Sequence, residues 1–585
     1  MPTAVETSPS SNLARYNRFL LLVAGLGGLL YGIDVGIIGG ALPYLEATSG
    51  LNRGQISIIV AAVLLGSVFS TLFAGLLADW LGRKPLMLLS GVAFSISVPV
   101  IALSHGFAPL FAGRLLQGVS GGLVGVVVPL YLAECLGART RGKGTGIFQW
   151  LLTLGIFVAA LMGIFLSYHV AEIARTASAD ALLHAKDLAW RSIFWMSLPP
   201  GLLFVVTVFF ISESPRWLFR RGRAAAARAA LLRSRTLEQA ALELDEMEQI
   251  AKEGKTGSGT AHKESLLSRR YVIPFILACV ILACNTATGI NSVIGYNVDV
   301  LLQSGLSDVM AHWGYVLFTF VNFLMTVVGL QLVDKKGRRF LLITGTSGIV
   351  VAMVAVGTLF LRTESHRFDV RDAVQSLVTA DNRLSVQFDD AALKRLGAPA
   401  TAAGPQSLAI IYSYGDFTSS TKPALLGDAE PAAIDRASSI PETKVAAFFQ
   451  KPFANLDEAR TAPLRILHAY ITPVPSAANG WIVAVCLYLF VGFYAMGPGV
   501  VVWLALSELM PTRIRSNGMS VALVLNQTVS TTLAAIFLPV VGKYGYSTMF
   551  YLFAGFTVVY FLTAAFFLPE TKGKTLEEIE KFFES

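Results

Sequence analysis

The stretch Gly75-Leu-Leu-Ala-Asp79-Trp-Leu-Gly82-Arg83-Lys84 ends an apolar run, and a related stretch, Gly329-Leu-Gln-Leu-Val-Asp334-Lys-Lys-Gly337-Arg338-Arg339, ends another far along the chain. Both copies place an acid, a glycine and two basic residues at the same spacing. Internal self-similarity of this kind indicates a chain built from related structural units. We therefore expect two halves of common design.

Two further motif pairs occur in the same order in each half. One is an acid followed by two arginines at fixed offsets, and the other is a proline–glutamate segment that closes the half. Their residues are Glu134, Arg139 and Arg141 against Glu508, Arg513 and Arg515, and Glu213-Ser-Pro-Arg216 against Pro569-Glu570-Thr-Lys-Gly573. The interval from Asp334 to Glu508 greatly exceeds that from Asp79 to Glu134, so the second half contains a long insertion.

The composition is that of a membrane protein. The 585 residues are 54% apolar and only 14% charged, and the mean hydropathy is +0.61. Soluble domains average about 25% charged residues, so a soluble enzyme, a nucleic-acid binder and a secreted disulfide scaffold are excluded. We predict an all-α polytopic protein whose transmembrane helices are the twelve apolar runs at about 18–42, 55–78, 85–104, 108–133, 144–168, 191–212, 272–302, 310–333, 339–361, 479–506, 517–541 and 547–568.

The basic residues indicate how the chain is oriented. The links after the second, fourth, eighth and tenth runs are rich in Lys and Arg, whereas the links after the first, third and seventh runs contain only one basic residue, Arg53. Positive charge favours the cytoplasmic side. We therefore expect a multi-pass protein of the cell membrane, plasma or inner, with both termini in the cytoplasm.

The runs divide the chain into seven segments. We predict a cytoplasmic tail (1–16), an N-terminal six-helix half (17–212), a cytoplasmic helical linker (213–270), three helices (271–361), an extracytoplasmic insertion (362–478), three more helices (479–568) and a cytoplasmic tail (569–585). Alternating apolar residues at 383–388 and 408–414 indicate strands in the insertion. Its Ala/Pro/Gly-rich joints leave disorder as the alternative.

Two repeated six-helix halves are typical of alternating-access carriers, in which a central site opens to either side. The chain also resembles the sugar porters of the major facilitator superfamily. The resemblance covers all twelve runs but not the insertion. It rests on the repeated motifs above and on Gly27-Gly-Leu-Leu-Tyr31-Gly-Ile-Asp34, Gly113-Arg114, Pro129-Leu-Tyr-Leu-Ala-Glu134, Glu213-Ser-Pro-Arg-Trp217, Gly289-Ile-Asn291, Gly497-Pro-Gly-Val-Val-Val-Trp503 and Pro569-Glu-Thr-Lys-Gly573. It implies the major facilitator fold.

The repeated charges predict a gate at the cytoplasmic ends of the helices, as the resemblance also implies. Carboxylates and guanidinium groups placed there can pair in one state of the cycle and separate in another. The alternative is a set of topology determinants with weak surface ion pairs. The candidate gate residues are Asp79, Arg83, Glu134, Arg141, Glu213, Arg216, Asp334, Arg338, Glu508, Arg515 and Glu570.

Asp34 is the sharpest single candidate. It lies past the midpoint of an apolar helix, where a carboxylate is costly unless it is paired or protonated. Arg114, on the fourth helix of the same half, is its expected partner, and a pair whose separation changes can take up and release a proton. The resemblance implies the same, because an Asp at this position marks proton-coupled members. The alternative is a buried pair that only holds two helices together.

The resemblance places the substrate site between the halves. Its residues offer amides, hydroxyls and one aromatic plane to a polyhydroxy compound. They are Tyr31, Gln149, Asn285, Thr286, Asn291, Asn322, Trp503, Asn526 and Gln527. A single intramembrane Asn can instead serve helix packing. Asn285, Thr286, Gly295 and Gln527 replace larger family residues, which implies a roomier pocket and a substrate that is not necessarily glucose.

The sequence thus predicts a proton-coupled symporter of a sugar or related polyol, working by alternating access. Two alternatives stay open: a facilitative uniporter, and a transporter-like receptor that uses the insertion. The expected partners are the small-molecule substrate, the proton and the lipid bilayer. We expect a monomer, no enzymatic activity, no nucleic acid, and no metal or cofactor, since no phosphate-binding loop or metal-ligand spacing occurs.

Overall fold

The computed structural model describes residues 9–585 apart from 137, 257–268, 398–404, 429, 442, 445–446, 449–450, 452, 511–514, 573–581 and 584–585. Only the backbone is described at 9–12, 138–145, 250–256, 270, 334, 503–508, 515–517 and 520. Within these residues, twelve helical segments are long and apolar enough to cross a membrane. The twelve predicted runs are therefore confirmed as helices of membrane length.

The N-terminal half consists of long, closely packed helices. They are α1 (Pro9–Thr48), α2 (Arg53–Leu81), α3 (Arg83–Ala102), α4 (Phe107–Cys135), α5 (Ala138–Ile173) and the consecutive α6 (Ala179–Met196) and α7 (Leu198–Phe209). The sixth crossing, α6 with α7, begins before the predicted apolar run. Ser178 caps the start of α6 by accepting a hydrogen bond from the Ala181 N–H. α6 is thus a polar extension of the predicted sixth span.

The C-terminal half repeats this plan with more helix breaks. Its elements are α11 (Arg269–Ala287), α12 (Ile290–Gly295), α13 (Asn297–Gln303), α14 (Asp308–Lys336), α15 (Arg338–Glu364), α21 (Ala477–Met496), α22 (Pro498–Leu509), α23 (Arg515–Tyr544), α24 (Tyr546–Leu562) and the π-helical turn η1 (Thr563–Phe567). The halves meet chiefly where α2 packs on α23 and α5 on α14. These are the second and eleventh crossings and the fifth and eighth, so the interface has the symmetry that the sequence repeat predicts.

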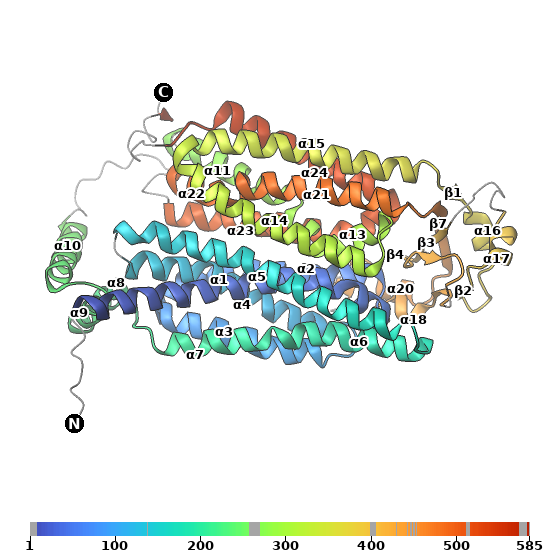
Figure 1. Ribbon diagram of the computed structural model, residues 1–585, viewed down its shortest axis with the longest axis horizontal. Helices are drawn as coiled ribbons and strands as arrows, with labels where there is room; N and C mark the ends of the chain where they lie inside the picture. Colours follow the sequence, from blue (N-terminus) through green and yellow to red (C-terminus); the bar gives the residue numbers. More distant parts are fainter. Residues whose placement is uncertain are drawn as a thin grey trace.

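The two ends of the bundle differ (Figure 1). At one end, which we call the linker end, lie the start of α1, the turn η1, and the connecting helices α8 (Pro215–Arg220), α9 (Ala224–Leu232) and α10 (Leu237–Thr256). At the other, the insertion end, the segment between α15 and α21 forms a separate lobe. The flanks of the bundle expose large apolar side chains such as Leu76, Phe165 and Val351, as expected of a surface that faces lipid.

The insertion is folded around its own core. Its elements are β1 (Phe368–Asp369), α16 (Arg371–Gln375), β2 (Leu384–Val386), α17 (Asp390–Arg395), β3 (Gln406–Tyr414), β4 (Phe417–Ser420), β5 (Ala424–Leu425), β6 (Ala432–Ile434), α18 (Arg436–Ser439), α20 (Leu456–Ala459) and β7 (Leu464–Pro473). An antiparallel sheet runs β1-β7-β3-β4, with β5 on β3, and β2 pairs with β6. Ile410, Tyr414 and Ala469 lie in its core. Strands form at both predicted stretches, within 384–386 and over 406–414.

Candidate functional site

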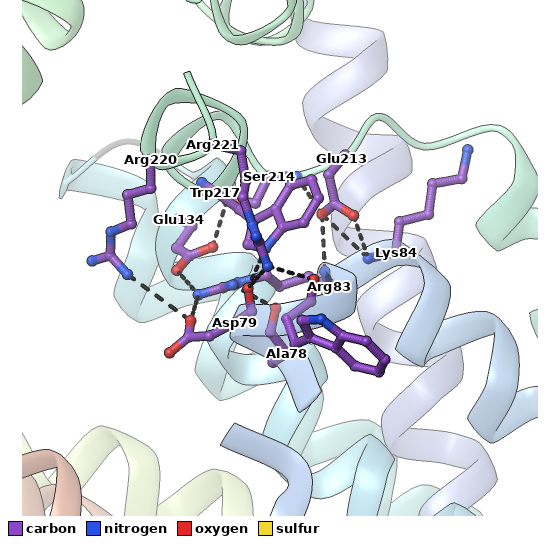
Figure 2. Close-up of polar contacts among 11 residues, drawn as sticks. Ala78, Asp79, Arg83, Lys84, Glu134, Glu213, Ser214, Trp217, Arg220 and Arg221 are labelled. Carbon is purple, nitrogen blue, oxygen red and sulfur yellow. Dashed lines mark hydrogen bonds and ion pairs between the residues drawn. The ribbon is translucent and has the colours of Figure 1, made fainter. Parts of the chain in front are cut away.

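At the linker end, Arg83 is the centre of a buried charge cluster (Figure 2). Its guanidinium is 2.8 Å from Glu134 Oε1 and 3.0 Å from Asp79 Oδ1, and it donates to the Ala78 carbonyl. Arg83 is 2% exposed and Glu134 8%. The Ser214 hydroxyl donates to the other oxygen of Glu134. The cluster therefore ties α2, α3, α4 and the start of the linker together, and it compensates the buried charges of Arg83 and Glu134.

Glu213 caps the N-terminus of α3. Its carboxylate accepts hydrogen bonds from the backbone N–H groups of Arg83 and Lys84, where the helix dipole also favours negative charge. Burial raises the pKa of Glu213, and the backbone donors oppose that shift. The residue before the helix, Gly82, has a φ of +106°, and an added Cβ would meet the Glu213 carboxylate. The glycine of the motif is thus required by both conformation and close approach.

The same cap recurs in the C-terminal half. Glu570 accepts from the backbone N–H groups of Arg338 and Arg339 at 3.0 and 3.1 Å, at the start of α15. Gly337 has a φ of +90°, as Gly82 has a positive φ in the first half. The repeated Gly-Arg-Lys/Arg motif and the repeated distal glutamate are therefore partners in space, an arrangement that the sequence pairs did not disclose.

The structure assembles part of the predicted gate set. Asp79, Arg83, Glu134 and Glu213 come together, as do Arg338 and Glu570. Arg216 is exposed and outside the cluster; Arg220 and Arg221, about one helical turn on, reach Asp79 instead. The side chains of Arg141, Asp334, Glu508 and Arg515 lie outside the described residues. Within the described part, every ion pair at this end joins elements of a single half.

At the insertion end, polar contacts cross between the halves. Arg53 on α2 pairs with Glu46 on α1 at 2.8 Å and with Asp299 on α13 at 3.4 Å, and Tyr546 donates to Asp299 at 2.6 Å. Tyr44 likewise donates to Asp308 at 2.8 Å. All three charged members of the first group are buried or nearly so. The structure is therefore closed at the insertion end.

Sequence reasoning missed this network. From the sequence, Arg53 was noted only as the single basic residue in the link after the first apolar run. The available signal was a pair of acids, Glu46 and Asp299, at the edges of apolar runs, where an uncompensated charge is costly. Which cation they meet depends on how the halves pack.

The insertion adds a further bridge between the halves. It is joined to the C-terminal half through α15 and α21, yet the Asn52 amide, at the start of α2, donates to the carbonyls of Ser438 and Ser439 at 3.1 and 3.3 Å. The Asn52 carbonyl oxygen meanwhile caps α2 by accepting from the Gln55 N–H. One side chain therefore serves as helix cap and as anchor for the insertion.

We expect Asn52→Ser to loosen the closed insertion end. Serine keeps the capping acceptor but loses both amide donors, and two hydrogen bonds contribute about 1–3 kcal/mol. In a background without the native cysteines, a Ser57→Cys reporter, at a fully buried position of α2 that contacts Tyr296 and Leu538, should then react several-fold faster with a maleimide. Equal labelling rates with and without the Asn52→Ser change would contradict a bridging role.

Mid-bundle, Asp34 is buried and unpaired. It is 1% exposed, and neither carboxylate oxygen has a hydrogen-bond partner in the part of the chain that the structure describes. Arg114 is 2% exposed and donates from Nη1 to Gln117 Oε1 at 2.6 Å instead. The predicted Asp34–Arg114 ion pair is therefore not formed in this state, although the positive charge of Arg114 acts on Asp34. Gln117 was not singled out by the sequence.

The amide and hydroxyl residues form a polar centre between the halves. Asn285 donates to the Tyr494 hydroxyl at 3.3 Å, and its Oδ1 has no partner among the described side chains. The Tyr31 side chain of α1 lies near the Gln527 side chain of α23 and near Tyr494. The centre thus gathers groups from α1, α11, α21 and α23, including Tyr494, which the sequence did not single out.

Other predicted substrate residues serve helix packing in this state. Asn526 donates to the Leu282 carbonyl, Thr286 to the Asn526 carbonyl, and Asn291 to Ser530. These bonds join α11 and α12 to α23. They match the alternative that an intramembrane Asn serves helix packing. Asn285, Tyr31 and Gln527 are therefore the groups more available to bind a substrate.

The remaining predicted residues are less defined. Gln149 is half-buried on α5 and Asn322 is buried on α14, and beside them Trp150 stacks on Phe323 at 5.4 Å, with its indole N–H unpartnered. The Trp503 side chain lies outside the described residues. Val60 and Ile38 lie beside Gly295, so this glycine does not widen the centre here.

A large groove lies away from this centre. It has a volume of about 460 Å³ and lies between α3 and α7, lined by apolar side chains and Ser95. A polyhydroxy compound would find almost no hydrogen-bonding group there.

Two repeated six-helix halves, a polar centre between them, and contacts between the halves that close the insertion end together define a secondary transporter of the alternating-access class. The sequence model of the family described as "Sugar (and other) transporter" matches residues 20–378 and 464–583. The chain belongs to this sugar porter family of the major facilitator superfamily. The internal gap in the match lies within the insertion, which agrees with the extent of the resemblance given above.

Relatives match over nearly the whole chain. The glucose transporter GlcP of Staphylococcus epidermidis is 27% identical over 569 residues, covering 96% of this chain and 97% of that protein. The human proton myo-inositol cotransporter is 27% identical over 586 residues, covering 97% and 82%. Probable inositol transporter 3 of Arabidopsis thaliana is 28% identical over 586 residues, covering 97% and 92%.

Solved structures share the fold. The xylose transporter XylE from E. coli, in a partially occluded inward open conformation, superposes with a TM-score of 0.64 at 20% identity, covering 96% of this chain and 100% of the other. The proton:xylose symporter XylE bound to 6-bromo-6-deoxy-D-glucose gives 0.61 at 22% identity, covering 98% and 100%.

Proposed function

We propose that the protein imports a sugar or related polyol together with a proton, with the linker end in the cytoplasm and the insertion outside. The observation that carries the proposal is Asp34, a carboxyl group buried mid-bundle with no hydrogen-bond partner among the described residues. An ionised carboxylate without a partner is strongly disfavoured in such a site, whereas a protonated one is tolerated. A group of this kind binds a proton where water reaches it and releases it after the halves rock.

The orientation is supported by the basic links. Arg83, Lys84, Arg338 and Arg339 lie at the linker end, where positive charge favours the cytoplasm. With that orientation, the Arg53–Asp299 and Tyr44–Asp308 contacts close the outer side, and the molecule faces the cytoplasm. The Arg83 cluster and the Glu213 and Glu570 caps at the linker end then stabilise the two halves as rigid units, and these charged groups act as a gate when the halves approach one another there.

The substrate class is supported by the relatives and by the polar centre. The names of the relatives include glucose, inositol and xylose, all polyhydroxy compounds. Asn285 offers a free carbonyl oxygen, Tyr31 a hydroxyl and Gln527 an amide, which suit alternating donor and acceptor hydroxyls. The protein acts as a monomer in the bilayer, since each chain contains both halves of the site.

Uptake of a panel of labelled hexoses, pentoses and inositols into proteoliposomes, with and without an inward proton gradient, tests this function. We expect one group of polyols to accumulate only with the gradient. Flux of the same compounds without accumulation would instead assign a facilitative uniporter. No movement of any member would place the substrate outside the polyols.

We expect Asn285→Leu to lower the apparent affinity for the transported polyol about tenfold, because it removes hydrogen bonds worth about 1.4 kcal/mol. Concentration-dependent counterflow measures this. Thr319→Val is the matched control, since the Thr319 hydroxyl is buried and bonds carbonyls of its own helix. Unchanged affinity in the Asn285 variant would remove this residue from the site.

A further inference from the structure

One face of α4 points at Asp34. Arg114, Gln117 and Gly121 are spaced three and four residues apart, so they lie in line along the helix. A Cβ at Gly121 would lie 2.8 Å from Asp34 Oδ2. The Asp34 carboxylate therefore sits over Gly121, and Gln117 lies one turn away, between Gly121 and Arg114 along the helix.

Along this face, several buried polar atoms of Gln117, Arg114 and Asp34 lack a hydrogen-bond partner among the described residues. Gln117 Oε1 accepts from Arg114 Nη1, while Gln117 Nε2 has no partner among the residues that the structure describes. Arg114 Nε and both oxygens of Asp34 are also unpartnered. Gln117 is fully buried, as the other two residues nearly are. Unmatched donors and acceptors on adjacent turns of a buried interface cost free energy, and an exchange of partners would remove that cost.

Few charges act on Asp34. Arg114 on α4 is the cation that faces it, and Tyr31, about one turn before it on α1, is the neighbouring titratable group. Gln527 approaches Tyr31 from α23 and does not titrate. Phe194 covers the Arg114 guanidinium at 5.7 Å. Within the described residues, then, the position of Arg114 is the main variable in the field at Asp34.

We propose that Gln117 is a positioning residue of the proton-coupling site: it holds Arg114 away from protonated Asp34 through Oε1, and yields Arg114 when Asp34 ionises. The proton leaves the Asp34 carboxyl group for water on the open side, and Arg114 keeps its charge throughout. Gln117 Nε2 then supplies a donor to the carboxylate. The proposal rests on proton-coupled transport by Asp34 and specifies how the affinity of this carboxyl group for the proton is set.

Gln117→Leu tests it. Leucine has a similar size but no hydrogen-bond acceptor. The Arg114 guanidinium then pairs with the Asp34 carboxylate, and the affinity of Asp34 for its proton falls. We expect the pH of half-maximal gradient-driven uptake to fall by about one unit, a tenfold change in proton affinity. Apparent polyol affinity at the most acid pH should stay within about twofold of wild type, because Asp34 is protonated there in both proteins. Thr346→Val on α15, where the buried hydroxyl donates to the Leu342 carbonyl of its own helix, is the control and should leave the profile unchanged.

The possible outcomes distinguish a failure of the Gln117 proposal from a failure of the proposed function. If wild type accumulates substrate and the Gln117→Leu profile superposes on it, Gln117 has only a structural role and the proposal is wrong. If wild type shows no gradient-driven accumulation, the proposed function fails and this proposal with it. If the leucine variant does not fold, Gln117→Met replaces it, and counterflow at acid pH shows how much of that variant is folded. A shift of its pH profile would support the positioning role of Gln117. An unshifted profile would leave Gln117 with only a structural role.

Discussion

Asp34→Asn should abolish accumulation while leaving exchange intact. Asparagine resembles the protonated acid in shape and charge but cannot release a proton, so the halves can still rock with substrate bound. In proteoliposomes with an inward gradient of about one pH unit, symport of one proton per substrate supports about tenfold accumulation. We expect that ratio to fall to one in the variant, whereas counterflow of labelled against unlabelled substrate continues.

The pH dependence of the two measurements gives the control. Counterflow by the Asp34→Asn variant should be flat across the range in which uptake by wild type falls as protons become scarce. Accumulation that survives in the variant would mean that another group carries the proton. Loss of both accumulation and counterflow would instead show that the carboxylate is needed for the fold or for substrate.

The second large effect is expected at Arg83. Arg83→Met leaves Glu134 buried beside Asp79 without its cation, and breaking a buried pair in this way costs about 3–5 kcal/mol. Unfolding of the purified protein in detergent, followed by heat or by sodium dodecyl sulfate, measures the loss. The double variant Arg83→Met, Glu134→Leu should recover much of the stability, because both charges are then gone.

Arg220→Met is the matched control for this prediction. Arg220 approaches the same Asp79 carboxylate at 4.0 Å but is exposed, so its removal should have almost no effect. If the Arg83 and Arg220 variants were equally stable, the buried cluster would not be what holds the linker end of this half together.

The sequence was sufficient for the architecture because apolar runs and repeats are local signals. It predicted the twelve crossings, the two halves and the repeated Gly-Arg-Lys/Arg motifs between helices. It did not predict that Arg53 pairs with both Glu46 and Asp299, since Asp299 belongs to the other half and becomes a neighbour of Arg53 only when the halves close.

Side-chain partners within one half were also hard to foresee. Arg114 was expected to pair with Asp34, but Gln117 on the next turn supplies an acceptor within the same helix. Arg216 was expected at the charge cluster, but the short helix α8 leaves it exposed, and Arg221 reaches Asp79 instead. Spacing alone does not say which face of a helix is turned inward.

We expect a proton gradient to drive uptake of a polyol through this protein. The most direct test is accumulation of the preferred labelled polyol in wild-type proteoliposomes with an inward proton gradient, before and after addition of a protonophore. The labelled polyol should accumulate above its outside concentration, and the two concentrations should become equal when the protonophore is added. Uptake that only ever reaches equality, with or without the gradient, would contradict this expectation.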